Sequence, residues 1–442
     1  MHAEMIFYRN KVQNMNKILC CLAFSALAAT GAYAQGTNSP YSQFGLGDLT
    51  DQSVGFNKGM SGVGQGFRKG NEINPLNPAS YSAVDSLSFI FDAGLSGQIT
   101  HYKEGGTKLN AKNGGFDYVM GLFRVFRNFG VTFGIMPYSN IGYSYSAKEK
   151  LTEPEATITT THDGSGGLNQ LFLGAGWRII KPLSVGVNFS YLWGDYDMKI
   201  TTASNTDINA LSKQYVASIN NYKLDFGIQA EIPVNKTDRV VLGATFSPGH
   251  SLKSDPECRL IHRNTAINKS DTTSYSITDG LKIPNTFGIG VAYHKDNRLR
   301  VGADFQLQKW GSIAYPDYVK VQDMGDYVLR DGMLRDAQKF NFGAEWLPNP
   351  NGRKYLQHVR YRIGAGFSTP YYNINGQKGP NEFHATIGFG IPILNAINNR
   401  SILNISASWQ RRSSSDLLSE NSFRINIGLT FNERWFAKWK VE

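Results

Sequence analysis

The stretch Ser422–Phe431, with the sequence SFRINIGLTF, shows the pattern that decides the fold. Apolar side chains occupy every second position from Phe423 to Phe431, and polar or small residues stand between them. Successive side chains of a β-strand point to opposite faces, so this period of two predicts a strand with one wholly apolar face. A strand of a soluble β-sandwich can show the same alternation, so the rest of the chain has to distinguish the two architectures.

The same alternation recurs through most of the chain, for example in 359–367, 383–391 and 403–409. About fourteen such segments can be placed, and an even number of antiparallel strands is expected of a single-chain outer-membrane barrel. We therefore predict an all-β fold, a transmembrane antiparallel β-barrel of about fourteen strands over residues 86–436, followed by a short tail, 437–442. The predicted strands are 86–103, 115–127, 129–147, 167–180, 183–201, 214–232, 238–252, 275–294, 298–312, 337–347, 357–372, 380–392, 401–413 and 421–436.

The predicted connections alternate between short and long. Short turns at one end and long loops at the other are typical of the periplasmic and extracellular ends of such barrels. The short joins are 127–128, 181–182, 233–237, 294–297, 348–356 and 394–399. The long joins are 104–114, 148–166, 202–213, 253–274 and 311–336.

Residues 1–34 have the features of a cleaved signal peptide. Lys17 provides a basic flank, Ile18–Ala29 is a short apolar run, and Ala32–Ala34 forms an A-x-A cleavage site. Met15 is an alternative start, because the residues before it add nothing that a signal peptide needs. Past this region no run of ~20 apolar residues could form a membrane-spanning helix. We predict export to the outer membrane of a Gram-negative bacterium.

Composition narrows the classes of function. The formal net charge is +10, which for an exported protein indicates basic residues that meet the anionic headgroups of outer-membrane lipids, with no role for nucleic acid. The histidines show no metal-ligand spacing, and no catalytic or phosphate-binding motif occurs. We predict a protein that is not an enzyme and that uses no cofactor and no metal. Barrel-assembly machinery is an expected partner during biogenesis.

Residues 35–85 read as compact irregular chain that packs inside the barrel. Gly62, Gly64 and Gly66 permit close approach of the backbone, and each Asn-Pro pair stiffens a turn. The second of these pairs begins the run Asn77-Pro78-Ala79. We predict that this segment is an N-terminal hatch or plug in the lumen, with Gly62, Gly64, Gly66, Asn77, Pro78 and Ala79 as its key residues.

The glycine run, the Asn77-Pro78-Ala79 run and Asp85 ahead of the first strand resemble the start of the FadL family of outer-membrane transporters, the FadL/TodX type. Members of that family are fourteen-stranded barrels whose N-terminal segment forms a lumenal hatch. The stretch Ser39–Gly45 also resembles divergent members of the Bacteroidetes type. Some of those act in secretion rather than in uptake. The resemblance implies passive transport of a hydrophobic small-molecule ligand.

A second matching feature is Pro137, within the third predicted strand. Proline removes a ladder donor, so a mid-strand proline requires a bulge or a gap in pairing. In a membrane wall such a gap must be covered or must line a cavity. The resemblance implies a kink that opens a lateral exit at Gly134, Pro137, Ser139 and Asn140. The alternative is that Pro137 lies above the membrane. Pro248, Pro284 and Pro370 also interrupt predicted strands.

If the apolar faces meet lipid, polar residues of the same strands line the lumen. Arginine binds carboxylates and phosphates through bidentate hydrogen bonds, so these side chains could clamp a ligand headgroup. Buried charges are usually paired, so they could instead hold the plug. The candidate residues are Arg360, Arg362, Arg424, Glu345, Asp304 and His384.

Three functions are open at this point. The first is passive, hatch-gated uptake of hydrophobic compounds, such as long-chain fatty acids or related lipophilic molecules, with lateral exit near Pro137. The second is a binding or shuttle partner of a secretion-system protein. The third is a structural or assembly role with a permanently plugged lumen.

Overall fold

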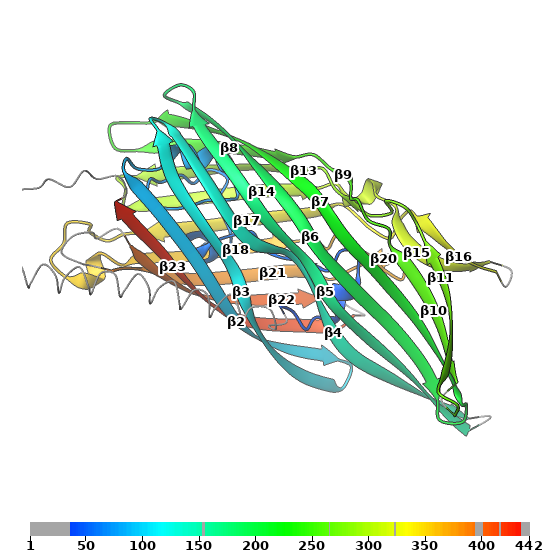
Figure 1. The fold of residues 1–442 in the computed structure, drawn as a ribbon. Helices are drawn as coiled ribbons and strands as arrows, with labels where there is room; N and C mark the ends of the chain where they lie inside the picture. The colour runs from blue at the N-terminus through cyan, green and yellow to red at the C-terminus, as the bar shows by residue number, and fades with distance from the viewer. Residues whose placement is uncertain are drawn as a thin grey trace, which may run out of the picture.

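The computed structural model describes residues 36–152, 155–264, 266–321, 324–393, 401–414 and 417–434. Within them, fourteen antiparallel strands close into a barrel, in which the last strand, β23, pairs with the first, β2 (Figure 1). This confirms the predicted fold and strand number. The barrel strands are β2 Ser88–Glu104, β3 Thr107–Phe126, β4 Phe129–Thr152, β5 Glu155–Arg178, β6 Leu183–Ser204, β7 Asn209–Pro233, β8 Arg239–Ser247, β13 Thr286–Lys295, β14 Leu299–Gln308, β17 Ala337–Trp346, β18 Arg360–Ser368, β21 Asn381–Pro392, β22 Ile402–Ser413 and β23 Ser419–Arg434.

Shorter elements lie inside the barrel or at its ends. They are the 3-10 helices η2 Pro40–Gln43, η3 Pro78–Ala83, η4 Trp310–Ser312 and η5 Tyr355–Gln357, the helix α2 Gly55–Lys58, and the strands β1 Asp48–Leu49, β9 His250–Ser251, β10 Glu257–Asn264, β11 Lys269–Ser276, β12 Lys282–Ile283, β15 Tyr315–Val321, β16 Met324–Arg330, β19 Asn373–Ile374 and β20 Gln377–Lys378. The predicted signal peptide (1–34), the predicted tail (437–442) and the predicted 394–399 turn lie outside the described residues.

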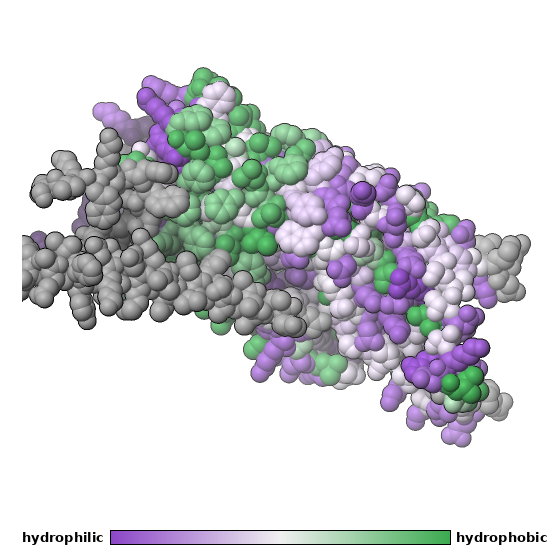
Figure 2. Space-filling view, viewed as in Figure 1, coloured by the Kyte–Doolittle hydropathy of each residue, from purple (hydrophilic) through white to green (hydrophobic). Residues whose placement is uncertain are grey.

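The apolar faces of the strands point outward. Phe423, Ile425 and Ile427 of β23 are 53, 59 and 50% exposed, whereas Asn426 between them is buried. Figure 2 shows the resulting apolar belt over one half of the barrel and a hydrophilic surface over the other half. No helix among the described residues is long and apolar enough to cross a membrane.

The hydrophilic half of the barrel is built from long strands, and here the prediction of loops was wrong. Residues 104–114, 148–166 and 202–213 are mostly strand, and β2 and β3 pair up to Glu104↔Thr107. Residues 253–274 and 311–336 hold the hairpins β10–β11 and β15–β16. Above the belt, the strands pair their backbone N–H and C=O groups with each other, and this pairing needs no apolar face. Their sequences therefore lack the alternation of apolar and polar residues on which the prediction relied. We call this half the polar extension.

Residues 36–85 lie inside the barrel, and we call them the plug. Val54, Met60, Val63 and Phe67 of the plug are fully buried and share an apolar cluster with Tyr118 and other inward wall residues. Figure 1 shows this segment in blue, enclosed by the strands. The main core of the molecule therefore lies between plug and wall, and the lumen holds protein at this level.

Candidate functional site

The Asn77-Pro78-Ala79 run forms the rigid turn of the plug. The Asn77 side chain accepts a hydrogen bond from the Ala79 N–H at 3.1 Å and so caps η3, and Pro78 occupies the first helical position, where no N–H is needed. The Asn77 amide also donates to the carbonyl of Ile228 in β7 at 3.1 Å and to that of Gln65 at 3.0 Å. One asparagine thus caps the turn and fastens it to the barrel wall.

The three plug glycines serve different purposes. Gly62 has φ +75°, a left-handed conformation that favours glycine. A Cβ on Gly66 would meet the Val241 carbonyl and the Ala292 N–H at 2.7 Å, and one on Gly64 would meet Leu76 at 2.5 Å. Gly62 therefore makes a turn, while Gly64 and Gly66 allow the backbone to fit tightly.

The wall supplies glycines of its own where the plug touches it. A Cβ on Gly186 of β6 would lie 2.3 Å from the carbonyl carbon of Pro78, and one on Gly243 of β8 would lie 1.9 Å from the carbonyl oxygen of Gln65. Contacts under 3.0 Å with backbone cannot be relieved by a side-chain movement. Similar contacts with plug backbone occur at Gly176, Gly343 and Gly364, and a Cβ on Gly227 would meet side-chain atoms of Asn77 and Pro78. The inner surface of the barrel is therefore shaped to the plug backbone.

A buried ionic cluster joins plug and wall at one level of the lumen. Glu72 of the plug accepts two hydrogen bonds from Arg300 of β14, with N–O distances of 2.8 and 3.0 Å. Arg300 also donates to Glu345 of β17 at 2.7 Å, and Glu345 binds Arg360 and Arg362 of β18 at 2.9 and 2.8 Å. We call these five residues the Glu72 cluster. It brings together Arg360, Arg362 and Glu345 of the predicted lumen residues.

Four of the five members of the Glu72 cluster are buried, and Arg360 is partly exposed. The four buried members, Glu72, Arg300, Glu345 and Arg362, are each at most 6% exposed. The Arg300 guanidinium also lies 5.4 Å from the ring centre of Phe67 in the plug, within range of a cation–π contact. Burial alone would raise the pKa of the Glu72 carboxyl, but the Arg300 guanidinium and Lys69 outweigh it and hold that pKa below its usual range. The Glu72 carboxylate is thus ionised and paired with Arg300 of the wall.

The remaining predicted lumen residues lie elsewhere. Asp304 of β14 accepts the backbone N–H groups of Gly64 and Gln65 at 2.6 and 2.9 Å, so it binds the plug directly. His384 lies 3.6 Å from Glu382, its neighbour on β21. Arg424 donates to Gln98 of the adjacent strand β2 at 2.8 Å. The structure therefore places neither His384 nor Arg424 in the Glu72 cluster.

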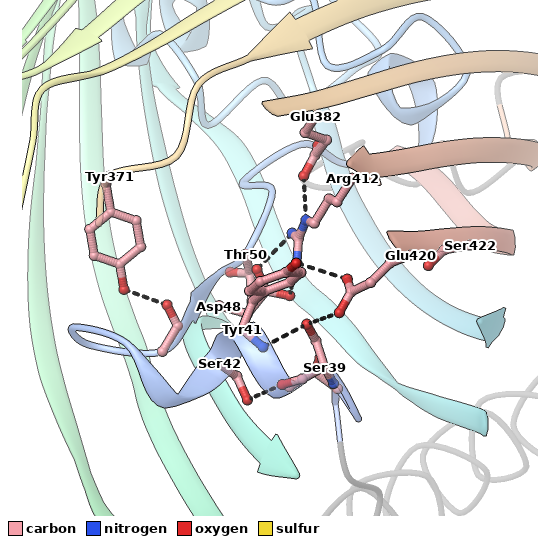
Figure 3. A network of polar contacts seen from close by, with 12 residues as sticks. Ser39, Tyr41, Ser42, Asp48, Thr50, Tyr371, Glu382, Arg412, Glu420 and Ser422 are labelled. Atoms are coloured by element: carbon pink, nitrogen blue, oxygen red, sulfur yellow. Dashed lines mark hydrogen bonds and ion pairs between the residues drawn. The ribbon is translucent and has the colours of Figure 1, made fainter. Parts of the chain in front are cut away.

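A second ionic cluster lies nearer the polar extension. Arg412 of β22 binds Asp48 of the plug at 2.7 Å and Glu382 at 2.8 Å, and Glu420 of β23 lies 3.7 Å from it (Figure 3). Ser39 of the plug donates to Glu420 at 2.5 Å. Figure 3 shows Asp48, Glu382 and Glu420 arranged around this arginine, while Tyr371, at some distance from it, donates its hydroxyl to a carbonyl of the plug. The plug is therefore tied to the wall at two heights.

The wall has a gap between β3 and β4. Their pairing runs from Phe126↔Phe129 only as far as Val119↔Ile135, although both strands continue beyond that point. Just past Ile135, β4 also has a register shift against β5, between Pro137 and Ser139. Gly134, by contrast, lies within the paired part, opposite Met120. The break in β3–β4 pairing thus begins directly after Ile135, two residues before Pro137.

The plug closes this gap. Its strand β1 pairs with β4 through Asp48↔Asn140 and Leu49↔Ser139. The Pro137 carbonyl, freed from the ladder, accepts a hydrogen bond from the Thr50 hydroxyl at 2.6 Å. On the β3 side, Asn113 donates to the carbonyl of Gly36 at 2.9 Å and Asn38 donates to that of Lys112 at 3.2 Å. The N-terminal part of the plug therefore contacts both strands that border the gap, β3 and β4.

Other interrupting prolines do not mark gaps. Pro248 follows β8, Pro284 precedes β13 and Pro370 follows β18, so all three lie just beyond strand ends. Since β8 pairs with β13 and β9 pairs with β12, Pro248 between β8 and β9 and Pro284 between β12 and β13 interrupt paired strands, as predicted. Pro370, by contrast, lies beyond the end of β18, so the prediction was wrong for this residue.

Two adjoining cavities remain between plug and wall, with volumes of about 160 and 550 Å³. Their shared lining includes Asp51, Gln306, Gln308 and Lys339, and amides, hydroxyls and charges predominate in the larger one. Among the described residues, no group of three His, Cys, Asp or Glu side chains is arranged to hold a metal ion. The larger cavity suits water and polar groups better than an apolar ligand, whereas the smaller one also has apolar lining from Met136 and Phe172.

Sequence reasoning missed several residues of the site. Arg300 alternates with Leu299 and Val301, so its inward direction could have been read from the period of β14. Glu72 and Arg68 lie in irregular chain, where no period exists. Arg68 is buried and donates to Ser184 of β6 at 2.8 Å. Its only signal was its place in the predicted plug.

Comparison with solved structures identifies the fold. A toluene transporter of Pseudomonas putida, TodX, matches with a TM-score of 0.64 at 14% identity, covering 88% of this chain and 100% of that one. A toluene transporter of Ralstonia pickettii, TbuX, matches with 0.56 at 14% identity, over 87 and 99%. A FadL homologue of Pseudomonas aeruginosa matches with 0.56 at 11% identity, over 87 and 99%. These likenesses show a FadL-type barrel fold.

Comparison by sequence gives the family. No curated protein matches the chain. The model of the BamG family matches residues 15–442, which include the plug and the fourteen strands described above. The chain is therefore a FadL-type barrel by fold, and it belongs to the BamG family.

Proposed function

We propose that this protein is a sealed outer-membrane barrel that acts as a structural subunit of the machinery that assembles other β-barrels. The observation that carries the proposal is the closure of the β3–β4 gap by the plug strand β1, through Asp48↔Asn140 and Leu49↔Ser139. A barrel whose side gap is bridged by its own chain, and whose lumen is largely occupied by it, suits a scaffold. The family's name, BamG, suggests association with barrel assembly.

The cost of moving the plug supports this role. Breaking a buried ion pair by separating its partners typically costs about 3–5 kcal/mol, because each charge is left without compensation. The plug holds Glu72 on Arg300 at one height and Asp48 on Arg412 at another. Opening the lumen would have to break both sets of contacts, after which Arg300 would keep only Glu345, and Arg412 would keep Glu382 and Glu420. A resting plug is thus strongly favoured over a displaced one.

The membrane placement follows from the belt. The exposed apolar side chains of β23 and its neighbours match the lipid-facing band of outer-membrane barrels. The polar extension then stands clear of the bilayer, where it offers a large hydrophilic surface to other subunits. We place the extension outside the cell and the short turns, such as 127–128, in the periplasm.

Passive uptake of hydrophobic compounds is the second candidate. It is favoured by the gap beyond Val119↔Ile135 and by the fold, which is shared with two toluene transporters. For uptake, residues 36–50 would have to leave the gap. The polar lining of the larger cavity opposes an apolar ligand, since burial of apolar surface gains free energy only where the surroundings are apolar.

Depletion of the protein in its native host separates the two candidates. The assembly role predicts that the amounts of other outer-membrane β-barrel proteins fall, while toluene entry into proteoliposomes containing the purified protein equals that into protein-free liposomes. Re-expression of the full chain is the control. Unchanged amounts of the other barrel proteins together with rapid toluene entry would contradict the assembly role and support uptake.

A further inference from the structure

The outer face of β22, β23, β2 and β3 carries a cluster of basic side chains at the upper border of the apolar belt. Strand register places Trp409, Phe423, Ile99 and Lys112 in one row across these four strands. The three apolar members of the row are 38, 53 and 42% exposed, so the row faces outward. In this row, three positions are apolar and the position on β3 is occupied by a lysine, Lys112.

The next outward rows are basic. Two residues further along the strands, Arg411, Asn421, His101 and Asn110 form a row, and two residues beyond that Lys103 faces Lys108. His101, Lys103, Lys108, Lys112 and Arg411 are all exposed. We call these five residues the basic rim. Outward side chains two apart on a strand are separated by about 7 Å, so the cations lie within reach of one or two headgroups.

The basic rim is local. On β17, β18 and β21 the last outward aromatic residues are Phe340, Phe367 and Phe383, and the positions two residues beyond them are Gln338, Thr369 and Asn381. None of those three is charged. Lys103, Lys108 and Lys112 form no ion pair with any other described residue. Their charges are therefore available to an external anion.

We propose that the basic rim binds phosphate-bearing headgroups of membrane lipids. Its position directly above exposed apolar side chains places it at headgroup height, and an exposed tryptophan at the border is typical of that interface. Each Lys or Arg near an anionic membrane surface adds favourable electrostatic energy that falls off within a Debye length. A soluble anion has no reason to select this height, whereas a lipid whose chains lie on Trp409 and Phe423 does.

The position of the rim gives the binding a consequence. The Lys112 carbonyl accepts the hydrogen bond from Asn38 of the plug, so the rim borders the gap that the plug closes. A lipid held there covers the outer side of the β3–β4 gap. The proposal concerns lipid alone and does not depend on the assembly role.

The test uses the purified full chain in detergent and native mass spectrometry with phosphatidic acid and phosphatidylcholine as probes. We expect phosphatidic acid to bind in preference to phosphatidylcholine, and the triple variant Lys103→Gln, Lys108→Gln, Lys112→Gln to lose at least about tenfold in affinity for it. The matched control is Lys253→Gln, Lys269→Gln, Lys282→Gln, which removes the same charge from exposed positions of the polar extension. It should bind like the unaltered protein.

Three outcomes would overturn the proposal. One is equal affinity of the rim variant and the unaltered protein. Another is the same loss in the control variant, which would indicate a net-charge effect. The third is displacement of phosphatidic acid by inorganic phosphate at equal concentration, which would indicate a site for the free anion. Circular dichroism of each variant checks that the barrel is folded, and all substituted lysines are exposed, so folding should be kept.

Discussion

Glu72 of the plug and Arg300 of the barrel wall face each other as a bidentate ion pair, with N–O distances of 2.8 and 3.0 Å, and both are almost fully buried. Bidentate pairing fixes the orientation of both groups as well as their distance. Because Arg300 also binds Glu345, the plug is held by a network that includes the side walls. The strength with which the plug is held therefore depends on a few charged side chains that can be substituted singly.

Glu72→Gln should loosen the plug and leave the barrel intact. The substitution removes one of the two carboxylates that compensate Arg300, Arg360 and Arg362, and an uncompensated buried charge costs about 3–5 kcal/mol. We expect conductance steps in planar bilayers where the unaltered protein shows none. The matched control is Arg330→Gln, which removes the exposed pair with Asp317 and should cost at most about 1 kcal/mol. If the Glu72→Gln variant shows no conductance steps, other contacts suffice to hold the plug.

Acid should open the barrel by the same route. Glu72 belongs to the plug, and its folded-state pKa lies below that of the unfolded chain. A depressed pKa means that the pair stabilises the folded protein above the unfolded value of about 4.3 and that this stabilisation is lost as pH falls further. Bilayer conductance should stay low from pH 7 to pH 5 and rise only below about pH 4. A rise already between pH 7 and 5 would point to a different group.

Gly186→Val should displace the Pro78 turn. The added Cβ would lie 2.3 Å from the carbonyl carbon of Pro78, and backbone cannot move aside cheaply. We expect trypsin to cleave after Arg68 or Lys69 in the variant, whereas the buried Arg68 protects this site in the unaltered protein. Gly97→Val is the control, since nothing lies within 4 Å of its Cβ position. Peptide mass mapping locates the cut, and equal protection of both variants would contradict the tight fit.

Much of the barrel could be predicted from residues such as Phe423 and Ile425, because a strand in a membrane wall must alternate. The long loops were wrong at Lys148–Gly166, because strands exposed to water on both faces carry no such period. The pairing of Glu72 with Arg300 could not be predicted, since the two are 228 residues apart and only the closed barrel brings them together. The closure of the gap by Leu49 was missed for the same reason.

The central claim is that the protein works with its side gap closed, and locking the gap tests it most directly. Leu49 and Ser139 are paired neighbours on β1 and β4, so Leu49→Cys with Ser139→Cys in a Cys258→Ser background should form a disulfide. Leu49→Cys alone is the control. In depleted cells, the sealed-barrel account predicts that the locked protein restores the amounts of other outer-membrane barrels as fully as the unaltered protein does. Failure of the locked protein, reversed by a reductant, would show that the gap must open and would contradict the account.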